Sequence, residues 1–500
     1  MIVYFSTLAG MESGLLADKF GNINAAYMKY GFPYCFGNSL LNTGISRPAD
    51  YSAQIVDELI ARVEMPISHS VFPVSQQEET LQEKPNIIFL QLESFFDPSH
   101  VKGVDFSENP LPNFTAMRTE YSSGYLSVPS VGAGTANTEF EVITGMNLDF
   151  FGPGEYPYKT ILKETTCESI AYNLREEGYK SHVIHNNDGT FYERNQIFPQ
   201  LGFDSFTSLE YMSVRDYTPM GWAKDSVLTG EIIKSLRSTK EPDVIYTISV
   251  QGHGSYPAER MESPVIRVEG LEEKENNSFE YYVNQIYEMD EFIGELTKQL
   301  SEYPERVILV MYGDHLPGFE FTEDDLTNGN IYQTEFIIWD NFNLEKRDRD
   351  LEAYQLSAYV MGQAGLYDGI LTKYHLAFSE DESYLEGLEL LQYDMLYGDR
   401  EVYSGENPYQ PTELVMGTDP ISMHGIVMLN DSCRVQGKNF TRYSRVAVNG
   451  EYVDTEYLNQ SALVIHEKLK DGDIITVHQA GKDSVSLSHT QEFEYHTAEE

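Results

Sequence analysis

The sequence has few cysteines, few basic residues for its acidic content, and no long hydrophobic run. Three cysteines (Cys35, Cys167 and Cys433) lie far apart in 500 residues, without metal-ligand spacing, so they indicate no disulfide framework. Against 34 lysines and arginines stand 79 aspartates and glutamates, which gives a formal net charge of −45 at pH 7. This charge argues against a partner nucleic acid and against a basic membrane-binding face, and it favours metal cations.

The absence of a run of about 18 apolar residues means that the sequence predicts no membrane-spanning helix. Residues 1–16 are mildly apolar, but they lack the basic start and long apolar centre of a signal peptide. A hydrophobic content of 41% is ample for a globular fold. Because 500 residues exceed one ordinary core, we expect one large domain with smaller appendages.

Short apolar runs alternate with amphipathic segments between residues 85 and 405. The runs, each typical of a buried parallel strand, are residues 86–92, 181–184, 244–250, 307–312 and 335–339. The clearest helical segment is residues 279–300, where apolar side chains recur at steps of four and three along one face. This alternation predicts an α/β domain over residues 85–405, with a mostly parallel sheet covered by helices on both faces.

The segments before and after this domain have other hydrophobic patterns. Residues 1–84 read as a helical and irregular linker, with helix-like apolar spacing at 23–30 and 51–63 and a polar stretch at 76–84. Residues 420–500 contain an Asn449-Gly450 hairpin signal and short alternating runs, which predict a small β-rich C-terminal domain. Nothing in the sequence indicates the role of that domain.

The segment VGAGTANTEF, residues 131–140, changes from small, flexible residues to a helical pattern predicted over 138–146. The first turn of a helix offers unpaired N–H groups and a positive dipole end, which suit an anion. The hydroxyl of Thr135 could cap this helix, or it could be a nucleophile that faces a phosphate.

Polar side chains follow four of the predicted strands at the point where each ends: Glu93, His185, His253 and the pair Asp314-His315. In an open parallel sheet, ligands bind beyond these carboxyl ends. Each of these residues, taken alone, could also be an ordinary turn or loop residue. Together, however, carboxylates and imidazoles form a mixed O/N site that admits manganese, magnesium or zinc.

Four ordered motifs resemble the extracellular catalytic domain of the lipoteichoic acid synthase family. The motifs are NIIFLQLES (86–94), GTANTEF (134–140), HNNDGTFYER (185–194) and YGDHLPG (312–318). That family belongs to the sulfatase-like branch of the alkaline phosphatase superfamily, and the resemblance covers about residues 85–400. It implies an alkaline phosphatase-like fold and the activity of a phosphoglycerol transferase.

The resemblance also implies roles for individual residues. One divalent cation, Mn²⁺ in these synthases and Mg²⁺ in some relatives, would be held by Glu93, Thr135, Asp314 and His315. Thr135 would be the nucleophile and His253 the second catalytic residue. The glycerol phosphate group would contact His185, Asn187, Tyr192, Arg194 and His253. The family commonly has Asp and Trp where this sequence has Asn187 and Tyr192, which leaves the glycerol contacts open.

The implied reaction moves glycerol phosphate from phosphatidylglycerol, or from another glycerophospholipid headgroup, to a polyglycerol phosphate or glycan acceptor. Family members act at the outer face of a bacterial membrane and carry N-terminal transmembrane helices that this sequence lacks, so we expect a soluble ectodomain. Two alternatives stay open. One is a phosphodiesterase or sulfatase-type hydrolase, although the Cys/Ser-x-Pro-x-Arg signature of sulfatases is absent. The other is a non-catalytic protein that binds cell-wall polymer, against which four intact metal-ligand positions count.

Overall fold

The computed structural model describes residues 23–41, 43–65, 84–429, 432–482 and 484–497. The predicted polar linker at 76–84 lies outside these residues, except for Lys84. Among the residues described before the main domain, the helices are α2 (Ile23–Tyr30), α3 (Phe32–Leu41) and α4 (Ala53–Val63). Ser52 caps α4, and Val56, Leu59 and Val63 bury its apolar stripe. In the part of the chain described, no helix is both long and apolar enough to cross a membrane.

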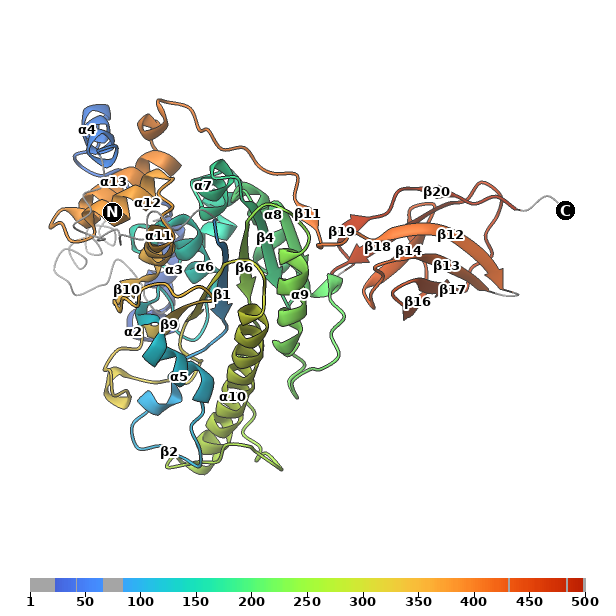
Figure 1. Cartoon of the computed structure of the whole chain (residues 1–500), viewed down its shortest axis with the longest axis horizontal. Helices are drawn as coiled ribbons and strands as arrows, with labels where there is room; N and C mark the ends of the chain where they lie inside the picture. The colour runs from blue at the N-terminus through green and yellow to red at the C-terminus, as the bar shows by residue number, and fades with distance from the viewer. Residues whose placement is uncertain (1–22, 42, 66–83, 430–431, 483, 498–500) are drawn as a thin grey trace.

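A nine-stranded sheet forms the centre of the main domain (Figure 1). Its strand order is β10 (Leu351–Glu352), β3 (Ser122–Ser127), β9 (Gln333–Asp340), β8 (Val307–Gly313), β1 (Asn86–Leu92), β6 (Asp243–Ile248), β4 (Lys180–His185), β5 (Ser205–Ser208) and β11 (Val415–Met416). Neighbouring strands are parallel except β9, which is antiparallel to both β3 and β8. The prediction of a mostly parallel sheet is therefore confirmed.

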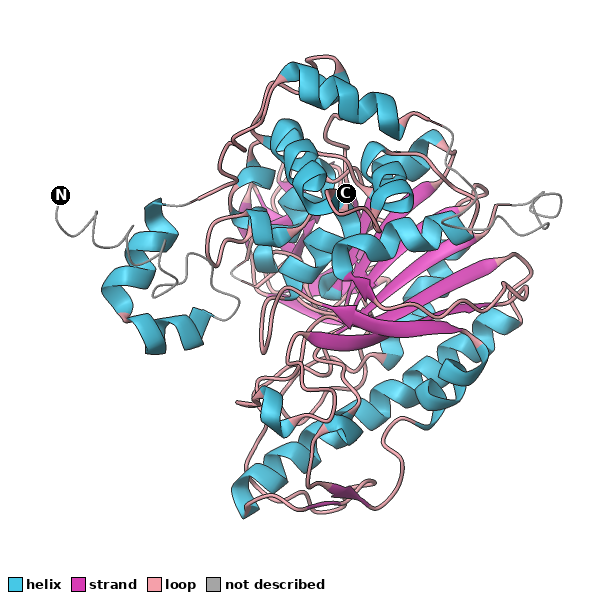
Figure 2. Cartoon of the chain, turned by 90° about the vertical axis from the view of Figure 1, so that its left-hand side faces the viewer, coloured by secondary structure: helices cyan, strands magenta, loops and turns pink. Residues whose placement is uncertain are grey.

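The fully buried strand β1 explains why the sheet needs cover on both faces. Alternate side chains point to opposite faces of a strand. Accordingly, Ile87 and Phe89 belong to one hydrophobic core, while Ile88 and Leu90 belong to another. Figure 2 shows helices on both sides of the sheet.

The helices divide between these two cores. The core around Ile88 includes residues of α5 (Pro112–Glu120), α9 (Ser226–Leu236) and α10 (Glu273–Ser301). The core around Phe89 includes residues of α6 (Thr135–Thr144), α7 (Ile170–Glu176), α8 (Arg194–Gln200), α11 (Ala353–Gln363), α12 (Ile370–Phe378) and α13 (Tyr384–Leu396). The apolar stripe predicted at 279–300 is the buried face of α10.

The C-terminal residues form two antiparallel sheets, which we call the C-terminal sandwich. One sheet contains β12 (Ser422–Leu429), β13 (Ser432–Lys438), β17 (Ala462–Ile465) and β16 (Thr455–Asn459). The other contains β15 (Glu451–Tyr452), β14 (Ser444–Val448), β18 (Ile474–Ala480), β19 (Ser486–His489) and β20 (Phe493–Glu494). A common core includes Val435, Leu463 and Ile475.

The hairpin predicted at Asn449-Gly450 joins β14 to β15, and both turn residues have positive φ, 51° and 86°. In Figure 1 the sandwich projects from the side of the main domain where β11 lies, the edge strand that pairs with β5. The sandwich therefore lies beside the end of the main sheet that consists of β4, β5 and β11.

Candidate functional site

Helix α6 begins at Thr135, three residues earlier than the sequence pattern predicted. Its N-cap is Gly134, in the left-handed region at φ 106°, where an added Cβ would lie 2.6 Å from Ser130 Oγ. Capping is therefore the wrong interpretation of Thr135. Its hydroxyl instead donates a hydrogen bond to Glu93 Oε2 over 3.0 Å.

Glu93, Asp314 and His315 meet because β1 and β8 are adjacent parallel strands that end at the same edge of the sheet. One ligand atom from each of these three residues lies within 4.8 Å of the others. All three are buried, and two polar atoms that lie 3.5 Å apart, Asp314 Oδ2 and His315 Nε2, have no hydrogen-bond partner. Buried polar atoms are rarely left unpaired, so this donor set fits a divalent cation.

The pKa shifts of Asp314 and His315 agree with a cation site at this cluster. Burial, together with the neighbouring Glu93 carboxylate, raises the pKa of Asp314 to about 7. Burial lowers the pKa of His315, but the carboxylates of Asp314 and Glu93 outweigh it and the net shift is upward. Two carboxylates so close and so buried are stabilised by a positive charge between them.

Ser94 orients the carboxylates, a role that the sequence analysis did not assign. Its hydroxyl donates to Glu93 Oε1 over 3.0 Å and its N–H donates to Asp314 Oδ1 over 2.8 Å. Ser94 has a positive φ of 52°, which turns the chain directly after the strand. Thr138, on α6, donates its hydroxyl to the carbonyl of Asp314 over 2.7 Å and so joins the Thr135 helix to the cluster. Such supporting hydrogen bonds fix the orientation of ligand side chains.

We call residues 185–194 the substrate loop, after the contacts with glycerol phosphate that the sequence resemblance implies for them. His185 Nδ1 lies 3.0 Å from the carbonyl oxygen of Ile248, which can only accept, so Nδ1 carries the proton. The other nitrogen, Nε2, then accepts from Arg194 Nη1 over 3.2 Å. Burial, and next the Arg194 charge, hold the pKa of His185 well below its usual range. His185 is therefore a neutral acceptor that orients Arg194, and not a proton donor.

Arg194 is also paired with Glu139, a second residue to which the sequence analysis gave no role. Arg194 Nε and Nη2 lie 3.1 and 2.5 Å from the two carboxylate oxygens of Glu139. The side chains are 1% and 0% exposed. Glu139 stands four residues after Thr135, one helical turn along α6, and this spacing was the available sequence signal.

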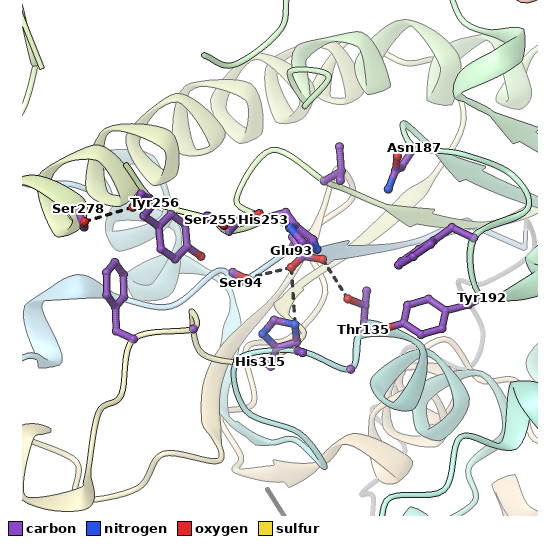
Figure 3. A pocket seen from close by; sticks show the side chains of 18 of the residues that line it. Glu93, Ser94, Thr135, Asn187, Tyr192, His253, Ser255, Tyr256, Ser278 and His315 are labelled. Atoms are coloured by element: carbon purple, nitrogen blue, oxygen red, sulfur yellow. Dashed lines mark hydrogen bonds and ion pairs between the residues drawn. The ribbon is translucent and has the colours of Figure 1, made fainter. Parts of the chain in front are cut away.

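The open space above these groups is a cavity of about 590 Å³. Figure 3 shows Thr135, Glu93 and His315 between two groups of lining residues. Asn187, Tyr192 and Arg194 line one side, and Tyr192 stacks on Tyr156 at 5.7 Å between ring centroids. Asp314 is near but does not line the cavity.

The other side of the cavity is lined by Tyr256 and Phe319, whose rings stack at 4.7 Å. His253 also lines the cavity. Its Nδ1 donates to the carbonyl of Gly254 over 2.5 Å, so Nε2 is the nitrogen that can act on a substrate. All of the predicted site residues except Asp314 thus line one cavity, and Asp314 lies beside it in the cluster with Glu93 and His315.

Comparison with known proteins supports the resemblance to sulfatases and lipoteichoic acid synthases. The sulfatase family model matches residues 85–366, more than half of the chain. A Rhizobium meliloti (strain 1021) protein assigned to cyclic beta-1,2-glucan modification is 28% identical over 423 residues, which are 76% of this chain and 63% of that protein. Lipoteichoic acid synthase 1 of Bacillus subtilis (strain 168) is 28% identical over 176 residues, 34% of this chain and 27% of the synthase. The chain thus spans less than two thirds of the length of these curated relatives.

Among solved structures, the Streptococcus pyogenes phosphoglycerol transferase GacH, in complex with sn-glycerol-1-phosphate, superposes with a TM-score of 0.60 at 21% identity. The match covers 72% of this chain and 97% of GacH, and it supports the alkaline phosphatase-like fold. The chain belongs to the sulfatase family and has lipoteichoic acid synthases among its relatives.

Proposed function

We propose that this protein is a phosphoglycerol transferase that forms a threonine-linked intermediate. Its donor is phosphatidylglycerol or a similar glycerophospholipid, and its acceptor is a hydroxyl of polyglycerol phosphate or of a glycan. The observation that carries the proposal is the Thr135 hydroxyl, which faces the cavity and is hydrogen-bonded to Glu93 of the candidate metal cluster. The relationship to lipoteichoic acid synthases supports the choice of phosphoglycerol as the transferred group.

In the first step, Thr135 Oγ attacks the phosphorus of the donor and the bond from phosphorus to the diacylglycerol oxygen breaks. Thr135 loses its proton toward Glu93 Oε2, along the hydrogen bond between them. Protonated His253 gives a proton from Nε2 to the departing oxygen, so diacylglycerol leaves as a neutral alcohol. Glycerol phosphate stays on Thr135 as a phosphodiester.

In the second step, an acceptor hydroxyl attacks the same phosphorus while His253 Nε2 takes its proton. The bond from phosphorus to Thr135 Oγ breaks, and Oγ takes back the proton that Glu93 Oε2 held, which restores the hydroxyl. Because the leaving alcohol and the entering alcohol use the same side of the phosphorus, both pass the His253 side of the cavity. The stacked pair Tyr256 and Phe319 lies on that side and offers an apolar wall to either alcohol.

The residues around Thr135 also account for recognition of the transferred group. Arg194 offers a fixed positive charge beside the cavity to the phosphate, since its Nε and Nη2 bond Glu139 and its Nη1 bonds His185 and the carbonyl of Phe191. Asn187 and Tyr192 line the same side and can contact the glycerol hydroxyls. Phosphoryl transfer needs mainly positioning and charge stabilisation, and this arrangement provides both.

A divalent cation fits the four groups Glu93, Thr135, Asp314 and His315, with Mn²⁺ the first choice and Mg²⁺ the second. When bound, such a cation lowers the pKa of a coordinated hydroxyl and stabilises charge on a phosphoryl oxygen. Asp314 Oδ2 and His315 Nε2, which have no hydrogen-bond partner, support this assignment. We place the reaction at the outer face of a bacterial membrane, where a glycerophospholipid donor and a cell-wall acceptor meet.

The experiment that tests the proposal follows phosphatidylglycerol labelled in both its acyl chains and its headgroup. A transferase releases diacylglycerol and moves the headgroup label to an added acceptor in equal amounts. A phosphodiesterase releases as much diacylglycerol but leaves the label as free glycerol phosphate whether or not acceptor is present. A non-catalytic binding protein releases neither. Thr135→Ala serves as the matched control for contaminating lipases.

A further inference from the structure

Glu210 connects the substrate loop to the C-terminal sandwich. It lies in a short 3₁₀ turn, Leu209–Tyr211, directly after β5. Its carboxylate accepts the backbone N–H of Gly189, with 3.3 Å to each oxygen, and the hydroxyl of Ser208 over 2.5 Å. Gly189 lies between Asn187 and Tyr192, so the side chain of Glu210 holds the middle of the substrate loop.

The backbone carbonyl of the same Glu210 is held by the sandwich. Thr441 donates its hydroxyl to this oxygen over 2.6 Å, and the side-chain amide of Gln479 donates to it as well. Gln479 has no exposed surface, and its own oxygen accepts from Ser444 Oγ over 2.8 Å. Glu210 therefore contacts the substrate loop through its side chain and the sandwich through its backbone carbonyl.

Further contacts between the sandwich and the main domain surround this connection. Lys482 donates its N–H to Asp188 Oδ2 over 3.3 Å, while Asp188 Oδ1 accepts the N–H of Thr190 over 2.8 Å. The hydroxyls of Tyr211 and Ser488 lie 2.6 Å apart. The sandwich thus contacts the loop directly at Asp188, as well as through Glu210.

The turn after β5 and the sandwich both limit the space around Gly189. A Cβ added there would lie 2.7 Å from Ser208 Oγ and 3.4 Å from Leu487 Cδ1 of the sandwich. Leu487 itself is partly buried against the core of the main domain. A side chain at position 189 would therefore displace either the β5 turn or the sandwich. The sandwich is part of the wall that shapes the loop.

We propose that the C-terminal sandwich positions the substrate loop, and that Glu210, Thr441 and Gln479 are positioning residues for the phosphoglycerol donor. The identity of this ligand rests on the proposed function, whereas the coupling between sandwich and loop does not. The residues between Gly189 and Arg194 include two with positive φ, Tyr192 and Glu193 at 57° and 60°. Such backbone conformations persist when surrounding contacts hold them, and the Glu210 connection supplies one such contact.

The test uses the full chain and a matched pair at one position. Thr441→Val removes the hydroxyl that donates to Glu210 and keeps the side-chain shape, while Thr441→Ser keeps the hydroxyl. Gln479→Leu is a second variant that removes the other donor, and Tyr457→Ser changes an exposed residue elsewhere on the sandwich. Hydrogen exchange of the 186–194 amides, donor KM and kcat, and thermal midpoints are measured for each.

We expect Thr441→Val and Gln479→Leu to accelerate exchange of the Gly189 amide and to raise the donor KM by about 3- to 10-fold, with kcat changed less. Thr441→Ser and Tyr457→Ser should behave like the wild type. Unchanged loop exchange and KM in both donor-deletion variants, with the sandwich folded, would overturn the inference. Faster loop exchange in a protein that binds no sn-glycerol 1-phosphate would instead refute the proposed function and leave the coupling intact.

Discussion

Glu139 accepts two hydrogen bonds from Arg194, and both side chains are shielded from solvent. Since Glu139 lies on α6 one turn after Thr135, the pair ties the substrate loop to the helix that carries the proposed nucleophile. The pairing, with the bonds from Arg194 Nη1 to His185 and to the carbonyl of Phe191, also fixes the position of the guanidinium charge beside the cavity. The position of the guanidinium relative to Thr135 is thereby set by a buried ion pair and not by a flexible side chain.

Breaking that pair should affect both stability and donor binding. Glu139→Gln leaves the buried Arg194 charge uncompensated, and loss of one partner of a buried pair costs about 3–5 kcal/mol. We expect a lower urea midpoint and a donor KM raised by more than about 10-fold, the equivalent of about 1.4 kcal/mol. The double variant Glu139→Gln/Arg194→Met should recover part of the stability but not the donor binding. Wild-type donor KM in Glu139→Gln would contradict the positioning role.

The two histidines of the cavity should differ in their kinetic effects. His253→Gln removes the proposed proton donor and acceptor, so kcat should fall by about 10²- to 10⁴-fold. His185→Gln removes a neutral acceptor that orients Arg194, so its main effect should be on donor KM. Steady-state kinetics over a range of donor concentrations separates the two. A larger kcat loss in His185→Gln than in His253→Gln would reverse the assignment.

Removal of the cation should lower activity and stability together, because it leaves Glu93 and Asp314 as buried, closely spaced carboxylates. We expect chelation to lower the thermal midpoint, and added Mn²⁺ to restore it with turnover, more effectively than Mg²⁺. Metal analysis should find about one equivalent in the wild type and in Thr135→Ala, but little in Asp314→Asn. Full turnover of a metal-free protein would exclude the cation from the reaction.

Glu210 predicts a pH dependence of folding stability. Burial raises its pKa from 4.5 to about 7, so the folded protein binds this proton more tightly than the unfolded chain does. Glu210 therefore contributes fully to the free energy of unfolding below about pH 4.5, and this contribution is lost as the pH rises through about 7. That loss is about 3 kcal/mol when each pKa unit is counted as 1.36 kcal/mol.

The matched variant for this prediction is Glu210→Gln, which cannot ionise. Urea unfolding at pH 5 and pH 8 should show a smaller difference in the free energy of unfolding for Glu210→Gln than for the wild type. Equal differences in the two proteins would mean that Glu210 does not titrate in this range.

Much of the main sheet could be predicted from the sequence, because its central strands are buried on both faces and read as continuous apolar runs. Strands β1, β4, β6, β8 and β9 were identified in this way. The antiparallel direction of β9 was not, because apolar runs carry no information about direction. The edge strands β10 and β11 have only two residues each, too few for a pattern.

The candidate site was predictable where a residue follows a strand, as Glu93 and Asp314 do. It was less so where a role depends on contacts between distant segments. The hydrogen bond from Thr135 to Glu93 and the N-cap at Gly134 decide against capping, yet both depend on the exact start of α6. The link from Glu210 to Gln479 spans 269 residues and leaves no local signal.

The measurement that tests the account most directly is peptide mass spectrometry of protein incubated with phosphatidylglycerol and no acceptor. We predict one added glycerophosphoryl group on the peptide that contains Thr135, lost when acceptor is supplied and absent in Thr135→Ala. Steady turnover without any modified peptide, or the same modification on another residue in Thr135→Ala, would contradict the proposal that Thr135 carries the transferred group.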